Sequence, residues 1–370
     1  MTHRSEGVGI IEGAPRNESF AAVNSGRGFI SFYKEIFGSP DVRRRYIIKG
    51  GPGTGKSSFM KRVAAEAEAR GRSVEYYRCA SDPGSLDGLI IKGAHGSVAI
   101  MDGTAPHVVE PVMAGAYDEI VDLGQFWDSD RLYENYNEIA ALGALKSESY
   151  ARAYKFLSGA LNVKEVNDAI VGKAFLAEKM EGAVDRIFRN IPEGRGACVR
   201  YGIVNAFGMH GSAHLYSYEQ TAKKLYTVFD CYGTGSRLLL YVLQCANAKG
   251  QSVRISVAPL EPDLPDAVYL EDIGIAFVLA DESGEDGETG TRINMRRFID
   301  DRVLSEKKSE YRINHRIFSA LLDAARESLG EAGRYHFKLE KIYSGCMDFS
   351  AQNAFVEEFC RKLFAFSLKM

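Results

Sequence analysis

The residues best suited to chemistry lie in one stretch that matches the phosphate-binding loop pattern G-x-x-x-x-G-K-[ST]. The stretch reads Gly50, Gly51, Pro52, Gly53, Thr54, Gly55, Lys56 and Ser57. Glycines allow such a loop to wrap around phosphate oxygens, so that backbone N–H groups and the positive end of the following helix face the anion. We expect Lys56 to reach the β- and γ-phosphates of ATP, Ser57 to bind Mg²⁺, and Ser58 to complete the nucleotide-binding set.

The segments on either side of this loop fit the motif. Residues 46–49 have the apolar character of a short buried strand, and residues 58–70 have the composition of a helix. A strand–loop–helix order is what a phosphate-binding loop requires. The alternative is a glycine-rich turn before an ordinary helix, and the flanking elements favour nucleotide binding over it.

Asp102 is the candidate for the acid that supports the metal. It follows the apolar run 98–101, so a strand would carry its carboxylate to the sheet edge, where it helps to hold Mg²⁺. A turn-capping aspartate is the alternative. The next residue is Gly103 rather than a glutamate, which leaves the water-activating group unassigned and leaves room for a kinase.

Three further residues follow predicted strands. Asp82 follows the strand predicted at 73–78, and His107 and Glu110 follow the strand that ends at Asp102. Ligands of open parallel sheets bind beyond the carboxyl ends of the strands, so Asp82 and His107 are candidate catalytic residues and Glu110 a candidate contact. The alternatives are a turn aspartate, a hydrogen-bonded histidine and a solvated glutamate.

The chain also contains a second copy of this pattern. Gly53 and Gly233 are 180 residues apart (233 − 53), and similar stretches recur downstream at almost the same spacing, at Gly71 and Gly250 (250 − 71 = 179) and at Asp102 and Asp281 (281 − 102 = 179). Three landmarks at nearly one spacing indicate a tandem duplication.

The second loop has lost its phosphate-binding residues. Asp230 stands in place of the first loop glycine and Ser236 in place of the lysine. A carboxylate repels phosphate, so we predict a degenerate site and one tightly bound nucleotide per chain. The alternative is that Arg237 restores a positive charge one residue later, but arginine lacks the geometry of the positioned lysine.

The elements that position these residues indicate an α/β fold of two P-loop-type parallel sheets in tandem, each followed by helices. We predict a first domain over residues 1–192, with a helical segment at about 114–190, and a degenerate second domain over 197–370, with a helical segment at about 293–370. The acidic, glycine-rich stretch 281–290 predicts a loop in the second domain.

Composition favours a cytoplasmic protein of about two domains. The chain has 370 residues and a net charge of −3, which gives no clear signal for nucleic acid or for an anionic membrane. Six scattered cysteines form no C-x-x-C pair and suggest reduced thiols. Residues 1–17 lack the apolar core of a secretory signal, and no run is long enough to span a bilayer.

Over nearly its whole length the chain resembles the uncharacterised bacterial proteins known as tandem P-loop ATPases. The resemblance rests on residues 24–33, on the first phosphate loop, and on the more specific stretches Ser81–Gly88 and Asp102–His107. Residues 123–128, His336, 339–340 and 347–349 continue it. The resemblance implies an ATPase. Members usually carry a second intact loop, and this chain departs from them at Asp230 and Ser236.

Three functions fit the sequence. We favour a Mg²⁺-dependent ATP hydrolase or ATP-driven switch acting through the first repeat. A kinase for a small molecule or nucleotide is the second, and a nucleotide-sensing adaptor with little turnover is the third. An unidentified protein partner or small-molecule substrate is compatible with each.

Overall fold

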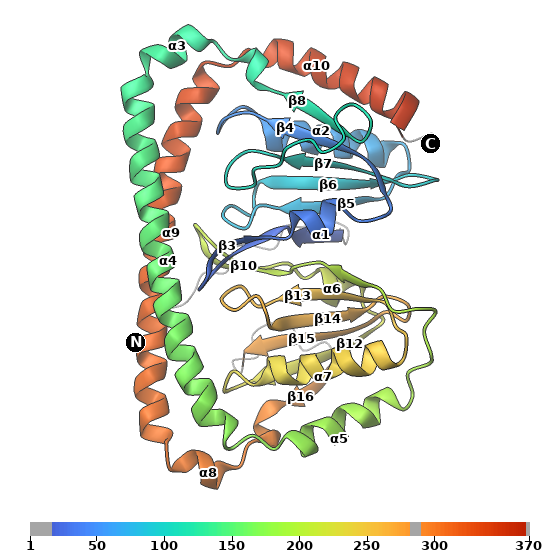
Figure 1. Ribbon diagram of the computed structural model, residues 1–370, viewed down its shortest axis with the longest axis vertical. Coiled ribbons are helices and arrows are strands. Elements are labelled where there is room, and N and C mark those ends of the chain that lie inside the picture. The colour runs from blue at the N-terminus through green and yellow to red at the C-terminus, as the bar shows by residue number, and fades with distance from the viewer. Residues whose placement is uncertain (1–16, 282–289, 368–370) are drawn as a thin grey trace.

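Two six-stranded β-sheets lie one above the other, and two long antiparallel helices run along one side of both (Figure 1). The computed structural model describes residues 17–281 and 290–367. The predicted loop at 281–290 and the amino-terminal stretch therefore fall largely outside the described residues. None of the helices within the described part combines the length and apolar character that crossing a bilayer requires.

The first sheet carries the intact phosphate loop. Its order is β1 (Asn17–Phe20), β5 (Val74–Arg78), β6 (Leu86–Lys92), β7 (Ser97–Asp102), β4 (Val42–Lys49) and β8 (Asp118–Asp122). β6 runs antiparallel to both neighbours, whereas the other neighbouring strands pair in parallel. The sheet is therefore mixed, and the prediction of a parallel sheet was wrong. Only the short turn 79–85 joins β5 to β6, and a parallel connection needs a crossover of a dozen residues or more.

The second sheet repeats this topology strand for strand. Its order is β9 (Val199–Tyr201), β13 (Val253–Val257), β14 (Pro265–Leu270), β15 (Ile275–Asp281), β12 (Lys224–Asp230) and β16 (Thr291–Asn294). The third strand, β14, is again antiparallel to its neighbours. Both halves thus share a mixed α/β architecture with the same strand order.

Each half extends a hairpin to the other half. β2 (Ala22–Ser25) and β3 (Gly28–Ser31) form one hairpin, and the Gly26 N–H donates to the Leu260 carbonyl at 2.9 Å. β10 (Asn205–Gly208) and β11 (Gly211–His214) form the other, and the Met209 N–H donates to the Ser81 carbonyl at 2.8 Å. These reciprocal contacts join the halves at their equivalent β5–β6 and β13–β14 turns.

The helices also occur in equivalent pairs. Each phosphate-loop strand is followed by a helix on its sheet, and a helical segment closes each half. The pairs are α1 (Tyr33–Phe37) with α6 (Ser217–Thr221), α2 (Lys56–Ala69) with α7 (Gly235–Ala248), η1 (Gly124–Phe126) with η2 (Met295–Phe298), α3 (Ser129–Glu134) with α8 (Asp301–Ser305), α4 (Tyr136–Gly172) with α9 (Lys308–Gly345), and α5 (Ala177–Phe188) with α10 (Phe349–Lys362), which continues into η3 (Leu363–Ser367).

The closing helices pack against the opposite sheet. α10 joins the core of the first sheet through Val356 and Phe359, and α5 joins the core of the second through Met180 and Val184. In Figure 1, α10 accordingly lies beside α2 and α5 beside α7. A helix of 37 residues such as α4 is about 55 Å long at 1.5 Å per residue, so it carries the next segment past its own sheet to the other.

Candidate functional site

The first phosphate loop lies between β4 and α2, in the strand–loop–helix order that the sequence predicts. β4 ends at Lys49 and α2 begins at Lys56. Gly53 and Gly55 have φ angles of +71° and +78°, in the left-handed region where a side chain would be strained. Gly53 and Gly55 are thus required by the backbone that the loop adopts.

Lys56 lies inside this loop. Its ammonium donates to the carbonyl oxygens of Gly50 (3.0 Å) and Gly51 (2.8 Å) and lies 3.6 Å from the Asp102 carboxylate. The lysine is therefore held by two carbonyls of its own loop and by one carboxylate. Two of the predicted catalytic residues, Lys56 and Asp102, come together at one sheet edge.

Asp102 ends β7, the parallel neighbour of β4. Its carboxylate accepts hydrogen bonds from the N–H (2.9 Å) and hydroxyl (2.5 Å) of Thr104. Burial raises the pKa of Asp102 above its ordinary value, and the Lys56 charge partly offsets this rise. The side chain is thus a desolvated acid whose ionised form depends on nearby positive charge.

The residues present fit a Mg²⁺ ion that is shared with a nucleotide. The predicted protein ligands are the Ser57 hydroxyl, which accepts a hydrogen bond from the Leu86 N–H at 3.1 Å, and the Asp102 carboxylate. The described residues hold no cluster of three or more His, Cys, Asp or Glu suited to a metal. Mg²⁺ is usually bound by one or two carboxylates together with substrate phosphates and water, so such a cluster is not required.

His107 is buried against an acid that the sequence analysis did not single out. Its Nε2 lies 3.2 Å from Oδ2 of Asp87, and both side chains are almost fully buried. The Tyr33 ring stacks on the imidazole at a centroid distance of 4.2 Å. Oδ2 of Asp87 and Nδ1 of His107 have no hydrogen-bond partner among the described residues. The result is a buried acid–base pair with unused hydrogen-bonding capacity.

Strand direction places this pair near Asp102. Gly88 of β6 pairs with Met101 of β7 in antiparallel register, which brings the preceding residue, Asp87, beside Asp102. The charges of both aspartates add to the effect of burial in raising the pKa of Tyr33. The sequence predicts no strand at 86–91 and therefore does not place Asp87 at the site. The signal that would have found it is the Asp82-Pro83-Gly84 turn, which returns the chain as an antiparallel strand that starts at the carboxyl edge.

Asp82 and Glu110 make other contacts. Asp82 caps the β5–β6 turn, where it accepts from the Gly84 N–H (3.2 Å) and the Ser85 hydroxyl (2.8 Å). Glu110 pairs with Lys49 at 2.9 Å. These are the contacts of a turn residue and of a surface ion pair, and Lys56 takes part in neither.

The carboxyl-terminal helices lie directly on the phosphate loop, which no local pattern indicated. A Cβ atom at Gly53 would lie 2.3 Å from the Glu340 carbonyl oxygen, and one at Gly51 would lie 2.8 Å from the Tyr343 ring. The buried Gln352 amide of α10 donates to the Thr54 carbonyl at 2.8 Å. Residues almost 300 positions downstream thus set the shape of the loop.

α4 adds a lysine close to the same place. Burial lowers the pKa of Lys146, and the charge of Lys56 lowers it further. One turn along the helix, the Tyr150 hydroxyl donates to the Ser81 hydroxyl at 3.2 Å. α4 therefore faces the carboxyl edge of the first sheet and brings a second cation towards Lys56.

The second loop is filled by its own aspartate. The Asp230 carboxylate accepts backbone hydrogen bonds from Tyr232 (3.2 Å), Thr234 (3.0 Å) and Gly235 (2.7 Å). Thr234 and Gly235 are the counterparts, 180 residues on, of Thr54 and Gly55 in the first loop. The Arg237 guanidinium lies over the Phe175 ring, 5.2 Å from its centroid, and Ser236 is buried. The carboxylate thus takes the place of the anion.

Comparisons of the chain with protein-family models, with curated proteins and with solved structures gave no match.

Proposed function

We propose that the chain is a Mg²⁺-dependent ATPase that binds one ATP in the first phosphate loop. The observation that carries this proposal is the position of Lys56, which lies within a complete loop and 3.6 Å from a largely buried strand-end carboxylate, Asp102. Loop amides, a lysine, a hydroxyl and a carboxylate at one sheet edge are the parts that phosphoryl transfer uses.

The loop residues would act mainly by binding and positioning. The ammonium of Lys56 exchanges the Gly50 and Gly51 carbonyls for β- and γ-phosphate oxygens, and the loop N–H groups hold the phosphate chain. Ser57 and Asp102 would hold a Mg²⁺ ion, which would supply positive charge to offset that of the phosphates. α10 holds the loop in shape through Gln352, and α9 lies against it at Glu340 and Tyr343.

In this proposal, Asp87 and His107 supply the water-activating group, which the sequence left unassigned. Attack by water forms a new P–O bond, breaks the bond between the β–γ bridging oxygen and the γ-phosphorus, and releases a proton. We assign the Asp87–His107 pair as the acceptor of that proton, since both members are buried and Nδ1 of His107 has no hydrogen-bond partner among the described residues. The Tyr33 ring holds the imidazole in place by stacking.

Phosphate release from MgATP, measured without any added acceptor, tests this function. Hydrolysis under these conditions supports the ATPase. Turnover only with a small-molecule acceptor would make the protein a kinase, and tight binding with negligible turnover would make it an adaptor.

Asp102→Asn provides the sharper test. We expect it to keep most of the ATP affinity, measured by calorimetry, and to lose most Mg²⁺-dependent turnover. Asp122→Asn is the matched control, because Asp122 ends the other neighbouring strand of β4 and accepts from the Gly124 N–H. Turnover at the wild-type rate in Asp102→Asn would remove Asp102 from the site.

A further inference from the structure

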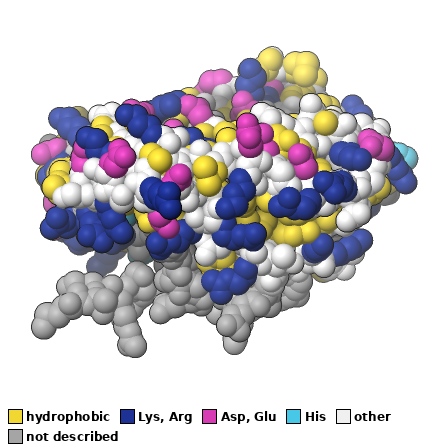
Figure 2. Space-filling view, turned by 90° about the horizontal axis from the view of Figure 1, so that it is seen from below, with side chains coloured by type: hydrophobic (Ala, Val, Ile, Leu, Met, Phe, Trp, Pro, Cys, Tyr) yellow, Lys and Arg dark blue, Asp and Glu magenta, His cyan; other side chains and the backbone are white. Residues whose placement is uncertain are grey.

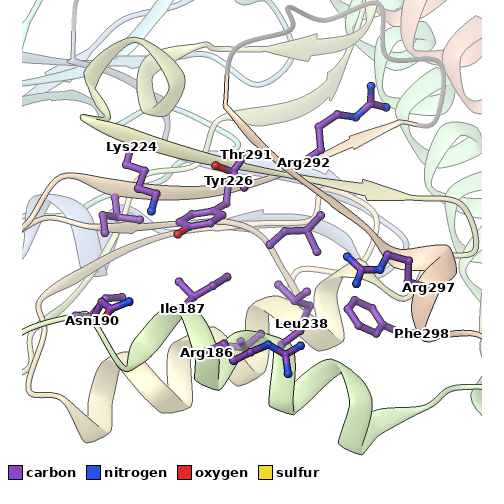
Figure 3. Close-up of a pocket in the computed structure, with 15 residues that line it drawn as sticks. Arg186, Ile187, Asn190, Lys224, Tyr226, Leu238, Thr291, Arg292, Arg297 and Phe298 are labelled. Carbon is purple, nitrogen blue, oxygen red and sulfur yellow. The ribbon is translucent and has the colours of Figure 1, made fainter.

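A cavity of about 470 Å³ opens between α5 and the edge of the second sheet (Figure 3). It lies at the end of the molecule formed by α5 and α8, whose surface shows many Lys and Arg side chains around hydrophobic ones (Figure 2). The apolar part of its lining includes Tyr226, Leu238 and Phe298, and the basic part includes Arg186, Lys224 and Arg297. Its volume is in the range of small-molecule pockets.

The cavity exists because two phenylalanines of the first half are absent from the second. In the first half, Phe359 packs against Tyr46 at 4.9 Å and Phe355 against Phe126 at 5.4 Å, measured between ring centroids. α10 begins 172 residues after α5 (349 − 177). This spacing places Ala183 in the position of Phe355.

The same spacing places Ile187 in the position of Phe359, while both receiving rings are kept as Tyr226 and Phe298. Replacing phenylalanine by alanine and isoleucine leaves the groove without the rings that fill its counterpart. A native core seldom leaves such a space unfilled.

The charged residues around the cavity also differ from those at the equivalent place in the first half. In the first half Arg44 pairs with Glu119, the residue opposite Tyr46 on β8. In the second half Thr291 stands opposite Tyr226 on β16, so the equivalent acid is missing.

The cations of the cavity are accordingly unpaired. Glu358 of α10 is likewise replaced by Arg186 of α5 (358 − 186 = 172). Within the described part of the chain, Arg186, Lys224 and Arg297 make no ion pair, and the lining includes no carboxylate. Lys224 instead lies over the Tyr226 ring at 4.8 Å. Figure 3 shows Lys224 and Arg297 extending towards the cavity from opposite sides.

We propose that this cavity binds a small organic anion with an apolar body, an aryl or acyl group that carries a sulfonate, carboxylate or phosphate. The apolar walls take the body by removing it from water, and the basic side chains of the lining attract the anionic group. This site is separate from the phosphate loop and does not depend on ATP binding.

The fluorescent aryl sulfonate 1-anilinonaphthalene-8-sulfonate is a suitable probe, because it combines an aromatic body with one negative charge. We expect saturable binding of one probe per folded chain. Ala183→Phe restores the ring of the first half, and it should weaken binding at least tenfold. Thermal unfolding and MgATP affinity of the same variant report whether the fold is kept.

Two charge variants test the cations without filling the cavity. Arg186→Gln and Arg297→Gln together should weaken sulfonate binding at least tenfold, whereas Arg316→Gln, an exposed arginine of α9, should leave it unchanged. The uncharged analogue N-phenyl-1-naphthylamine should be insensitive to the charge variants.

Equal sulfonate binding in the wild type and the double arginine variant would overturn the proposal, as would unchanged binding in a folded Ala183→Phe variant. If Ala183→Phe does not fold, sulfonate binding by the double arginine variant still tests the proposal.

Discussion

The two loops lie at equivalent places, each between a strand and the helix that follows it, and differ in the charge at their centre. In the first, Lys56 donates to the carbonyls of its own loop. In the second, Asp230 accepts from three of its loop N–H groups. A loop of convergent N–H groups needs an anion, because unpaired amides are costly. The second repeat meets this need with a side chain, whereas under the proposed function a ligand meets it in the first.

The largest expected effect is on MgATP affinity, when the lysine of the first loop and its counterpart in the second are each replaced. Lys56→Ala should weaken MgATP binding by about a thousandfold, since two unit charges at ~4 Å interact by about 4 kcal/mol at an effective dielectric constant near 20. Ser236→Ala, the equivalent change in the second loop, should leave affinity and stoichiometry unchanged. Calorimetric titration measures both, and a stoichiometry of two in the wild type would contradict the comparison.

Removing the internal anion tests the second loop directly. Asp230→Ala leaves three backbone N–H groups without their acceptor and should lower the free energy of unfolding by about 3 kcal/mol. Urea denaturation measures this loss. The control is Asp263→Ala, which breaks an exposed ion pair with Arg27 and should cost less than ~1 kcal/mol. Equal losses would show that Asp230 does not stabilise its loop.

A buried acid on the antiparallel strand β14 extends the comparison to the pH dependence of stability. Asp266 is the counterpart of Asp87 (266 − 87 = 179), and burial raises its pKa to about 6. The unfolded value is about 3.9, so between these values the folded state binds more protons and stability falls as pH rises. Above about pH 6 the loss of stability that ionised Asp266 causes no longer changes with pH.

Asp266→Asn removes this ionisation. Relative to wild type, its free energy of unfolding should therefore rise by up to about 3 kcal/mol between pH 4 and pH 7. Urea titrations at pH 4, 5, 6 and 7 provide the difference. If the difference in unfolding free energy between the two proteins does not change with pH, Asp266 has the same pKa in the folded and unfolded states.

The smallest expected effect concerns the helix that crosses to the first loop. Gln352→Ala leaves the Thr54 carbonyl without its buried donor, which should cost about 1–2 kcal/mol and weaken ATP binding up to about tenfold. Gln125→Ala removes an exposed amide that donates to the Asp122 carbonyl and should leave binding unchanged. Full ATP affinity in Gln352→Ala would show that α10 does not shape the loop.

Local pattern was enough for the parts of the site that are close in the chain. The residues between β4 and α2 determine the loop because glycine spacing, an apolar strand and a helical stretch are short-range properties. The apolar run that ends at Asp102 located the other acid in the same way. The spacing between Gly53 and Gly233 also corresponds to two sheets with one strand order.

Tertiary structure decided what the chain brings together over long distances. The antiparallel direction of β6 placed Asp87 beside Asp102 and against His107. The long helices α4 and α9 carry the closing helices α5 and α10 each to the sheet of the other half. Glu340, Tyr343 and Gln352 reach the first loop only through that exchange. Sequence periodicity reports which face of an element is buried, but it does not report which element covers that face, because that choice depends on packing between distant segments.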